Sequence, residues 1–161
     1  MFATGFDAMT GSLLKIDVRG RDGHSLRAKW EGGPTTYLGV QVAGFPNMFV
    51  ITGPGSPSVL TNMPMAIEQH VEWISDCISY LREHGLTRVE ATADAEDAWV
   101  EHVRQVAEAT LFPRANSWYL GANIPGKKRV FMPYVGGFEP YHKRCEEIVA
   151  NDYEGFAFSS G

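Results

Sequence analysis

The chain has 161 residues, which is the size of a single domain with no room for a second core of full size. Apolar residues make up 44% and charged residues 20%, a globular composition that excludes a disordered chain. The formal net charge of −5 argues against a dedicated nucleic-acid binder, because such proteins usually carry a basic balance. No run approaches the roughly 18 apolar residues of a membrane span, and the N-terminus does not read as a signal peptide. We therefore expect a soluble, cytoplasmic protein.

Cysteine and histidine are too few and too scattered to predict a metal site. Cys77 and Cys145 fall below any disulfide framework or four-ligand zinc pattern, which favours a reducing compartment. His142 lies three residues before Cys145 and shares its helix face, but two ligands do not make a zinc site. The other histidines are expected to be single surface or cap residues: His24, His70, His84 and His102.

The first stretch, up to about Thr52, is punctuated by glycine and resembles strands. Residues 13–18 form a short β run, residues 20–23 turn the chain back, and residues 25–30 are expected to pair with the first run as a hairpin. Residues 48–51 have the length and β-branched content of a buried strand.

The middle stretch is predicted to be helical. Pro64 suits the first turn of the first helix, and Gly85 suits its end. Its apolar residues recur at spacings of 4, 3, 4 and 3, which is one stripe of an α-helix: Ile67, Val71, Ile74, Ile78 and Leu81.

A second helix is predicted over residues 93–110. Trp99, Val103, Val106 and Thr110 share one face. Residues 90–108 carry a net charge of −5, which we interpret as a solvated acidic face.

The last stretch, residues 113–161, begins irregularly. It is predicted to hold a strand over residues 129–132 and a short helix over residues 139–151. Its charge is opposite, with a net +5 over residues 114–145.

The segment of residues 51–63 is the most informative part of the sequence. A buried strand is expected to end, a Gly/Pro-rich loop follows, and a helix is predicted to begin close to Thr61 or Asn62. The unpaired N–H groups of a helix start can bind an anion or an electron-rich carbonyl. The loop matches neither the Walker motif nor GxGxxG. It is either a ligand-facing loop or a structural connector in which Asn62 is a plain N-cap.

A second cluster joins Trp118 and Tyr119 to the glycine- and lysine-containing residues 121–129. An indole N–H can donate to a ribose or an amide while its ring stacks on a planar ligand, and nearby lysines can attract phosphate. The alternative is an aromatic side chain packed under a turn, with solvated lysines. A hydrolase is not supported, since no GxSxG is present and prolines flank Ser56 and Ser58.

Five ordered motifs together resemble a known family. They are residues 2–11, 44–49, 53–58, 68–73 and 117–127. In this order they look like the C-terminal third of a flavin-dependent Baeyer–Villiger monooxygenase, closest to the phenylacetone and steroid monooxygenase branch. The resemblance covers nearly the whole chain.

The resemblance implies an α/β fold, as the C-terminal segment of the FAD-binding domain of a flavoprotein with two dinucleotide-binding domains. Residues 1–11, which include the ATG motif, match the end of the NADP domain and its linker. Residues 12–161 match the later part of the FAD domain, with mixed strands and three helices. The implied activity oxidises ketones to esters or lactones with dioxygen, using FAD and NADPH.

The resemblance also implies the site residues. Asn62 and Met63 match positions at the flavin ring, with the Met63 backbone N–H directed at the pyrimidine carbonyl. Trp118 matches the tryptophan that contacts NADP. The loop that lines the ketone pocket is matched by Ser58, Val59, Leu60 and Thr61.

The chain departs from the family pattern because it contains neither GxGxxG nor FxGxxxHxxxW. The resemblance places the catalytic arginine and its aspartate partner in an absent N-terminal part, so no catalytic residue is expected in this segment. We expect the isolated chain to be inactive and to expose an apolar face where the absent part would dock. The alternative is a non-catalytic module that keeps the flavoprotein fold for ligand or partner binding.

Overall fold

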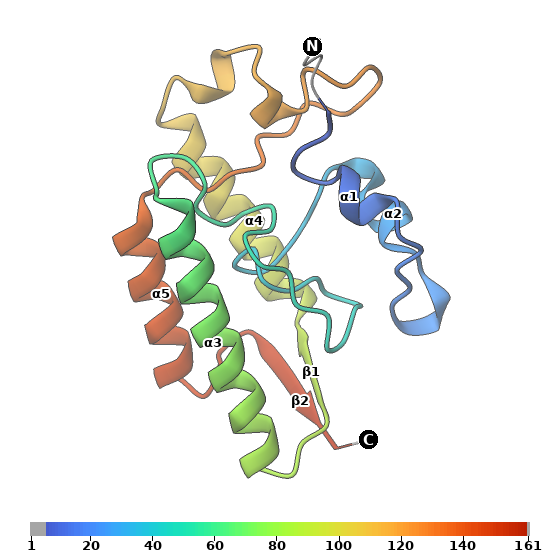
Figure 1. Ribbon diagram of the computed structural model, residues 1–161, viewed down its shortest axis with the longest axis vertical. Coiled ribbons are helices and arrows are strands. Elements are labelled where there is room, and N and C mark those ends of the chain that lie inside the picture. The colour runs from blue at the N-terminus through green and yellow to red at the C-terminus, as the bar shows by residue number, and fades with distance from the viewer. Residues whose placement is uncertain (1–5, 161) are drawn as a thin grey trace.

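The computed structural model describes residues 6–160, so the motif at residues 2–5 lies outside the described residues. Three helices of 13 or more residues form the body of the described chain, and a two-stranded sheet lies beside the end of one of them (Figure 1). Within residues 6–160, no helix is long and apolar enough to cross a membrane. The helices and strands are α1 (Gly11–Leu14), α2 (Leu26–Lys29), α3 (Met63–Glu83), β1 (Arg88–Ala91), α4 (Ala93–Glu108), α5 (Phe138–Ala150) and β2 (Phe156–Ser159).

The structure confirms the three long helices that the sequence predicts, including the positions of Pro64 in the first turn of α3 and Gly85 after its end. The buried face of α3 differs from the predicted apolar stripe. Of the predicted stripe, Leu81 is buried and Ile74 packs against the core, whereas Ile67, Val71 and Ile78 are exposed. The other buried residues of α3 are Ala66, Gln69, His70, Trp73 and Cys77. Both faces of α3 carry apolar residues, so periodicity identified the helix but not its buried side.

The main core lies where α3, α4 and α5 meet the sheet. Trp73 of α3 contacts Tyr153 edge-on, with ring centroids 5.5 Å apart, and packs against Phe156 of β2. Trp99 and Val103 of α4 belong to the same core cluster, as the sequence predicts.

The sheet is antiparallel and pairs Arg88 with Ser159 and Ala91 with Phe156. The sequence did not predict either strand. Each strand has four residues, which is too short for a clear alternation of buried and exposed side chains.

The strands that the sequence predicts elsewhere are wrong. Part of residues 13–18 lies in α1, and most of residues 25–30 lies in α2. The Ser25 side chain accepts a hydrogen bond from the Ala28 N–H, and this N-cap favours a helix at that place. The turn over residues 20–23 is confirmed.

Residues 48–51 and 129–132 are irregular rather than regular strands. The backbone near residue 49 forms only an isolated bridge, between Gln41 and Phe49, and the Val50 N–H donates to the Val40 carbonyl at 2.9 Å. An apolar run therefore marks burial here without marking a strand.

Two acidic residues join the α4 region to the N-terminal stretch. Glu96 is only 1% exposed; its carboxylate lies 2.6 Å from the Lys29 ammonium and accepts from the Ala43 N–H at 2.8 Å. Glu90 of β1 pairs with Arg21 and accepts from the Gly44 N–H. The prediction of a uniformly solvated acidic face is therefore wrong for Glu90 and Glu96, whose partners are too far away in sequence to be recognised.

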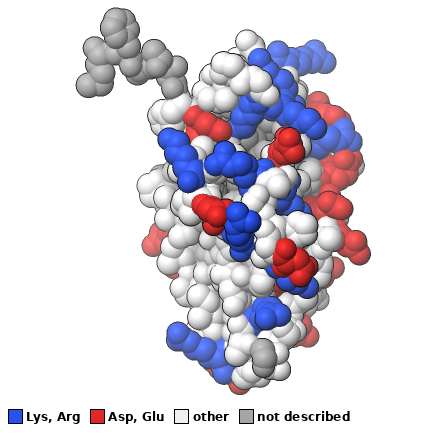
Figure 2. All heavy atoms as spheres, turned by 90° about the vertical axis from the view of Figure 1, so that its right-hand side faces the viewer, with Lys and Arg blue, Asp and Glu red and all other residues white. Residues whose placement is uncertain are grey.

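Figure 2 shows that basic and acidic side chains are interspersed on the face beside α1 and α2, next to a broad uncharged area.

Replacing Lys29 with Met is expected to lower the free energy of unfolding by about 2 kcal/mol, because the buried Glu96 carboxylate loses its cation. Urea unfolding at neutral pH measures this loss. The control is Lys15→Met, which alters an exposed lysine without a described ion pair. Equal stability of the two variants would contradict the proposed role of the Lys29–Glu96 pair.

Candidate functional site

The first half of the predicted ligand loop, residues 53–57, is buried and held by hydrogen bonds. The Gly55 N–H donates to the Met132 carbonyl at 2.7 Å, and the Gly55 carbonyl accepts from Nε1 of Trp99 at 3.1 Å. The Ser56 carbonyl accepts from the Tyr134 N–H at 3.0 Å. These bonds satisfy backbone groups that have no ladder partner. Residues 53–57 therefore act as a structural connector.

A close backbone approach explains one glycine beside this connector. A Cβ atom on Gly39 would lie 2.4 Å from the Cβ atom of Ser56, and Gly39 has a φ of +74°. Only glycine satisfies both constraints, so this position is required for the connector to pack against the core.

The second half, residues 58–63, differs because it presents unpaired groups. The hydroxyl oxygens of Ser58 and Thr61 are buried and have no hydrogen-bond partner in the described chain. Leu60 is 75% exposed and has a φ of +62°, a left-handed conformation that is uncommon for leucine. Val59 is buried and anchors this segment. A left-handed leucine and two unpartnered hydroxyls thus lie within four residues of one another, and such features occur at binding segments.

Helix α3 begins at the end of this segment. Asn62 occupies the N-cap position, as the N-cap interpretation predicts, but its side chain forms no cap hydrogen bond. Among the described residues, the backbone N–H groups of Asn62 and Met63 have no acceptor. A 21-residue helix thus directs free N–H groups and the positive end of its dipole outward.

The second predicted cluster lies against the same anchor. Tyr119 packs on the small apolar cluster that contains Val59, and Trp118 contacts Tyr119 with ring centroids 4.1 Å apart. Trp118 is 44% exposed, so its indole lies half-exposed beside Tyr119.

Lys127 is not the solvated lysine of the alternative interpretation. Its ammonium lies 2.7 Å from both the Asp7 carboxylate and the Thr10 hydroxyl. These contacts tie residues 6–10 to the loop around Lys127. The Lys127 ammonium is consequently engaged within the chain, which leaves it poorly placed to attract phosphate.

His70 of α3 holds the residue that precedes the connector, Thr52, by a hydrogen bond. This role differs from the expected surface or cap histidine. His70 is fully buried, and its Nδ1 accepts from the Thr52 N–H at 2.9 Å. Its Nε2 lies 2.7 Å from the Tyr141 hydroxyl, which donates to the Leu38 carbonyl at 2.7 Å. Burial lowers the pKa of His70 to about 4. The sequence carried no signal for this role, because the partners lie on three separate segments.

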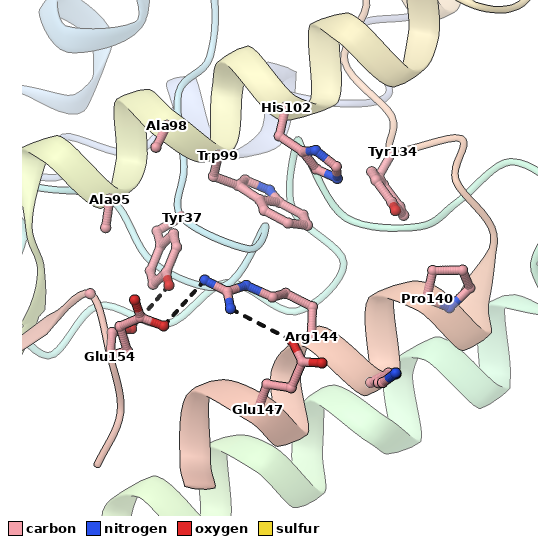
Figure 3. A pocket seen from close by; sticks show the side chains of 12 residues that line it. Tyr37, Ala95, Ala98, Trp99, His102, Tyr134, Pro140, Arg144, Glu147 and Glu154 are labelled. Atoms are coloured by element: carbon pink, nitrogen blue, oxygen red, sulfur yellow. Dashed lines mark hydrogen bonds and ion pairs between the residues drawn. The ribbon is translucent and has the colours of Figure 1, made fainter. Parts of the chain in front are cut away.

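A cavity of about 570 Å³ lies between α4 and α5 (Figure 3). Trp99, His102 and Tyr134 form an aromatic wall, and Arg144 crosses the cavity toward Glu154, 3.3 Å away. A smaller cavity of about 320 Å³ also has Trp99 and Gly55 in its lining. No local sequence pattern indicates either cavity, because the lining residues come from distant segments, and neither cavity is lined by residues 58–63.

Within residues 6–160, no three His, Cys, Asp or Glu side chains are grouped to hold a metal ion. His142 stacks on Phe138, with ring centroids 5.6 Å apart, and Cys145 is buried.

Replacing Leu60 with Gly is expected to raise the free energy of unfolding by about 1 kcal/mol, because glycine adopts a positive φ without strain. Chemical unfolding measures the change. The matched control is Leu111→Gly, since Leu111 is also 75% exposed but has a φ of −86°. That control should be destabilised by about 0.5–1 kcal/mol; if both variants lose stability alike, the left-handed conformation of Leu60 stores no strain.

His70 is expected to make stability depend on pH. The pKa of this imidazole is 6.5 in the unfolded chain and about 4 in the folded chain. Between pH 6.5 and about pH 4, the unfolded chain therefore binds a proton that the folded chain does not. The contribution of the neutral imidazole is therefore complete above pH 6.5 and is lost as the pH falls toward 4, by up to about 1.4 kcal/mol per pH unit. Urea unfolding of wild type and His70→Asn over this range should give a flatter curve for the variant. Parallel curves would refute the buried neutral histidine.

Comparisons with known proteins show what the chain is similar to. No protein-family model matches the chain. The chain is 45% identical over 154 residues to cyclohexanone 1,2-monooxygenase of Acinetobacter sp, covering 96% of the chain and 28% of that protein. It is 46% identical over 160 residues to acetone monooxygenase (methyl acetate-forming) of Gordonia sp. (strain TY-5), which covers 99% of the present chain and 30% of the Gordonia protein.

Solved structures give the same result. The structure of cyclohexanone monooxygenase from Rhodococcus sp. Phi1 bound to NADP+ matches with a TM-score of 0.96 at 44% identity. The match covers 99% of the present chain and 30% of the Rhodococcus protein. Oxidised steroid monooxygenase bound to NADP has a TM-score of 0.89 at 52% identity, over 98% and 29%. The predicted α/β fold and the predicted resemblance are confirmed. Over nearly its whole length, the chain is homologous to Baeyer–Villiger monooxygenases, and it spans less than a third of their length.

Proposed function

We propose that this chain is the C-terminal portion of an NADPH- and FAD-dependent Baeyer–Villiger monooxygenase that oxidises ketones to esters or lactones with dioxygen. Relatives named for this activity support the proposal, as does a structure of OTEMO in complex with FAD and NADP, at 40% identity and a TM-score of 0.88. In this proposal, residues 1–11 belong to the end of the NADP domain and its linker, and residues 12–161 to the FAD domain.

The start of α3 is the observation that carries the proposal. The free N–H groups of Asn62 and Met63 lie at the positive end of a long helix dipole. The pyrimidine edge of a flavin offers carbonyl oxygens and carries negative charge when the ring is reduced. The donor set therefore fits this edge, with the Met63 N–H directed at a pyrimidine carbonyl. Bound FAD supplies the redox chemistry, whereas the helix start binds and orients its ring.

The residues that precede α3 suit the neighbouring ketone. The apolar side chain of Leu60 is exposed to solvent, and the buried side chain of Val59 anchors the adjacent backbone. The unpaired hydroxyls of Ser58 and Thr61 offer polar contacts to a ligand seated on this segment. We assign the ketone-lining role to these four residues and no catalytic role to any residue of the chain.

Trp118 is proposed to contact NADP. Its half-exposed indole offers a flat face and an N–H donor, the two groups suited to a nicotinamide nucleotide. The buried, unpaired cysteines Cys77 and Cys145 support a reducing compartment, and we propose the cytoplasm.

A non-catalytic binding module is the second candidate. The exposed apolar stripe of α3, with Ile67 and Val71 at its centre, favours it as a surface for a partner. The coding sequence upstream distinguishes the two candidates. An in-frame GxGxxG with FxGxxxHxxxW supports the monooxygenase, whereas their absence there and in any companion chain supports the module.

Titration of the purified chain with FAD, with and without NADP+, is expected to show no saturable binding. The glycine-rich motif that binds the pyrophosphate is absent from the sequence, so the chain offers only the flavin-ring part of a site. Flavin fluorescence and absorbance follow the titration. Saturable binding in the micromolar range or tighter would contradict the proposed division of the site.

A chimera can be made from cyclohexanone monooxygenase by replacing its corresponding C-terminal segment with this chain. In this chimera, removal of the Met63 N–H is expected to weaken FAD binding about tenfold or more. Met63→Pro removes the donor, and proline is well tolerated at the first position of a helix. Met63→Leu, which keeps the N–H, serves as the control. FAD content and ester formation from cyclohexanone are measured; full activity of the Pro variant would refute the assigned role of this donor.

A further inference from the structure

We propose that His70 is a positioning residue that sets the geometry of residues 58–63, and that Tyr141 keeps His70 in the tautomer this task requires. The inference rests on the proposed function, because it assigns these two residues to the support of the flavin and ketone site. The set of Thr52 N–H, His70, Tyr141 and the Leu38 carbonyl is called the His70 bridge below.

The His70 bridge closes the base of the candidate ligand loop. The bond from the Thr52 N–H to Nδ1 of His70 joins two residues 18 positions apart, and residues 58–63 lie between them. His70 lies on α3, seven residues after its first residue, so the bond fixes the loop entrance relative to the start of the helix. We infer that the bond thereby helps to set how residues 58–63 approach the helix start.

The direction of every hydrogen bond in the His70 bridge can be assigned. A backbone N–H can only donate, so Nδ1 is an acceptor and the imidazole proton lies on Nε2. That proton is donated to the Tyr141 oxygen, whose own proton is donated to the Leu38 carbonyl. The main-chain groups at the two ends thus fix a single orientation, and a neutral His70 satisfies it.

Thr52 shows what the His70 bridge supports. This residue is β-branched and has a φ of +53°, which is a strained conformation for a threonine. In the described chain its N–H has no acceptor other than His70. Without Nδ1, the left-handed conformation loses its partner, and the backbone can relax toward the β region at the entrance of the loop.

Two near-isosteric substitutions separate positioning from packing. In His70→Asn, the amide oxygen lies near the place of Nδ1 and can still accept from Thr52. In His70→Gln, the amide end lies near the place of Nε2 and can reach Tyr141 but not Thr52. Both variants remove the buried ring, so a purely structural role predicts similar losses in both.

The first measurement uses the isolated chain and requires no cofactor. Nitrogen-15 NMR is expected to show the His70 proton on Nε2 and a slowly exchanging Thr52 amide. Tyr141→Phe removes the acceptor of the Nε2 proton, so it should populate the other tautomer and speed Thr52 exchange about tenfold. A proton on Nδ1 in the wild type, or an unchanged Thr52 amide in Tyr141→Phe, would overturn the inference.

The second measurement uses the cyclohexanone monooxygenase chimera described above, with FAD affinity and flavin reduction potential as readouts. His70→Asn should bind FAD within about threefold of the wild type, whereas His70→Gln should bind about tenfold more weakly and shift the potential. If the unmodified chimera retains no FAD and forms no ester, the proposed function fails. If the unmodified chimera is active and the Asn and Gln variants behave alike, the proposed function stands and the positioning role of His70 is refuted.

Discussion

Buried backbone without regular secondary structure must find its hydrogen-bond partners one by one, and this constraint shapes the structure. Residues 53–57 are buried as a loop, and their N–H and carbonyl groups are paired with groups on distant segments, such as the Met132 carbonyl and the Trp99 indole. Because these partners come from α4 and from the segment before α5, the loop can form only when the core has assembled. The local conformation is therefore a consequence of the tertiary fold.

The same logic extends to charge. Glu96 is buried on α4 and pairs with Lys29, while Glu90 pairs with Arg21, so the N-terminal stretch is held to the core through two ion pairs. A buried carboxylate is tolerated only when its cation and its N–H donors are in place. These contacts hold residues 21–44 against β1 and α4.

A well-held connector next to a segment with unpaired groups is a suitable arrangement for binding. The connector at residues 53–57 has its polar backbone satisfied, whereas Ser58 and Thr61 present orphaned hydroxyls and Leu60 holds a left-handed conformation. Such unsatisfied groups are costly unless a ligand completes them. The connector interpretation thus describes residues 53–57, and the ligand-site interpretation is our proposal for residues 58–63.

The sequence by itself determined the three long helices, the special character of residues 51–63 and the family resemblance. Helix periodicity, the proline and glycine at the ends of α3, and ordered motifs are local signals that need no knowledge of distant contacts. Only the tertiary structure decided which face of α3 is buried, that residues 48–51 form no strand, and that His70 joins Thr52 to Tyr141. The physical reason is that these features depend on segments far apart in the sequence. Such segments decide which apolar face of α3 is covered, and they supply the hydrogen-bond partners of His70.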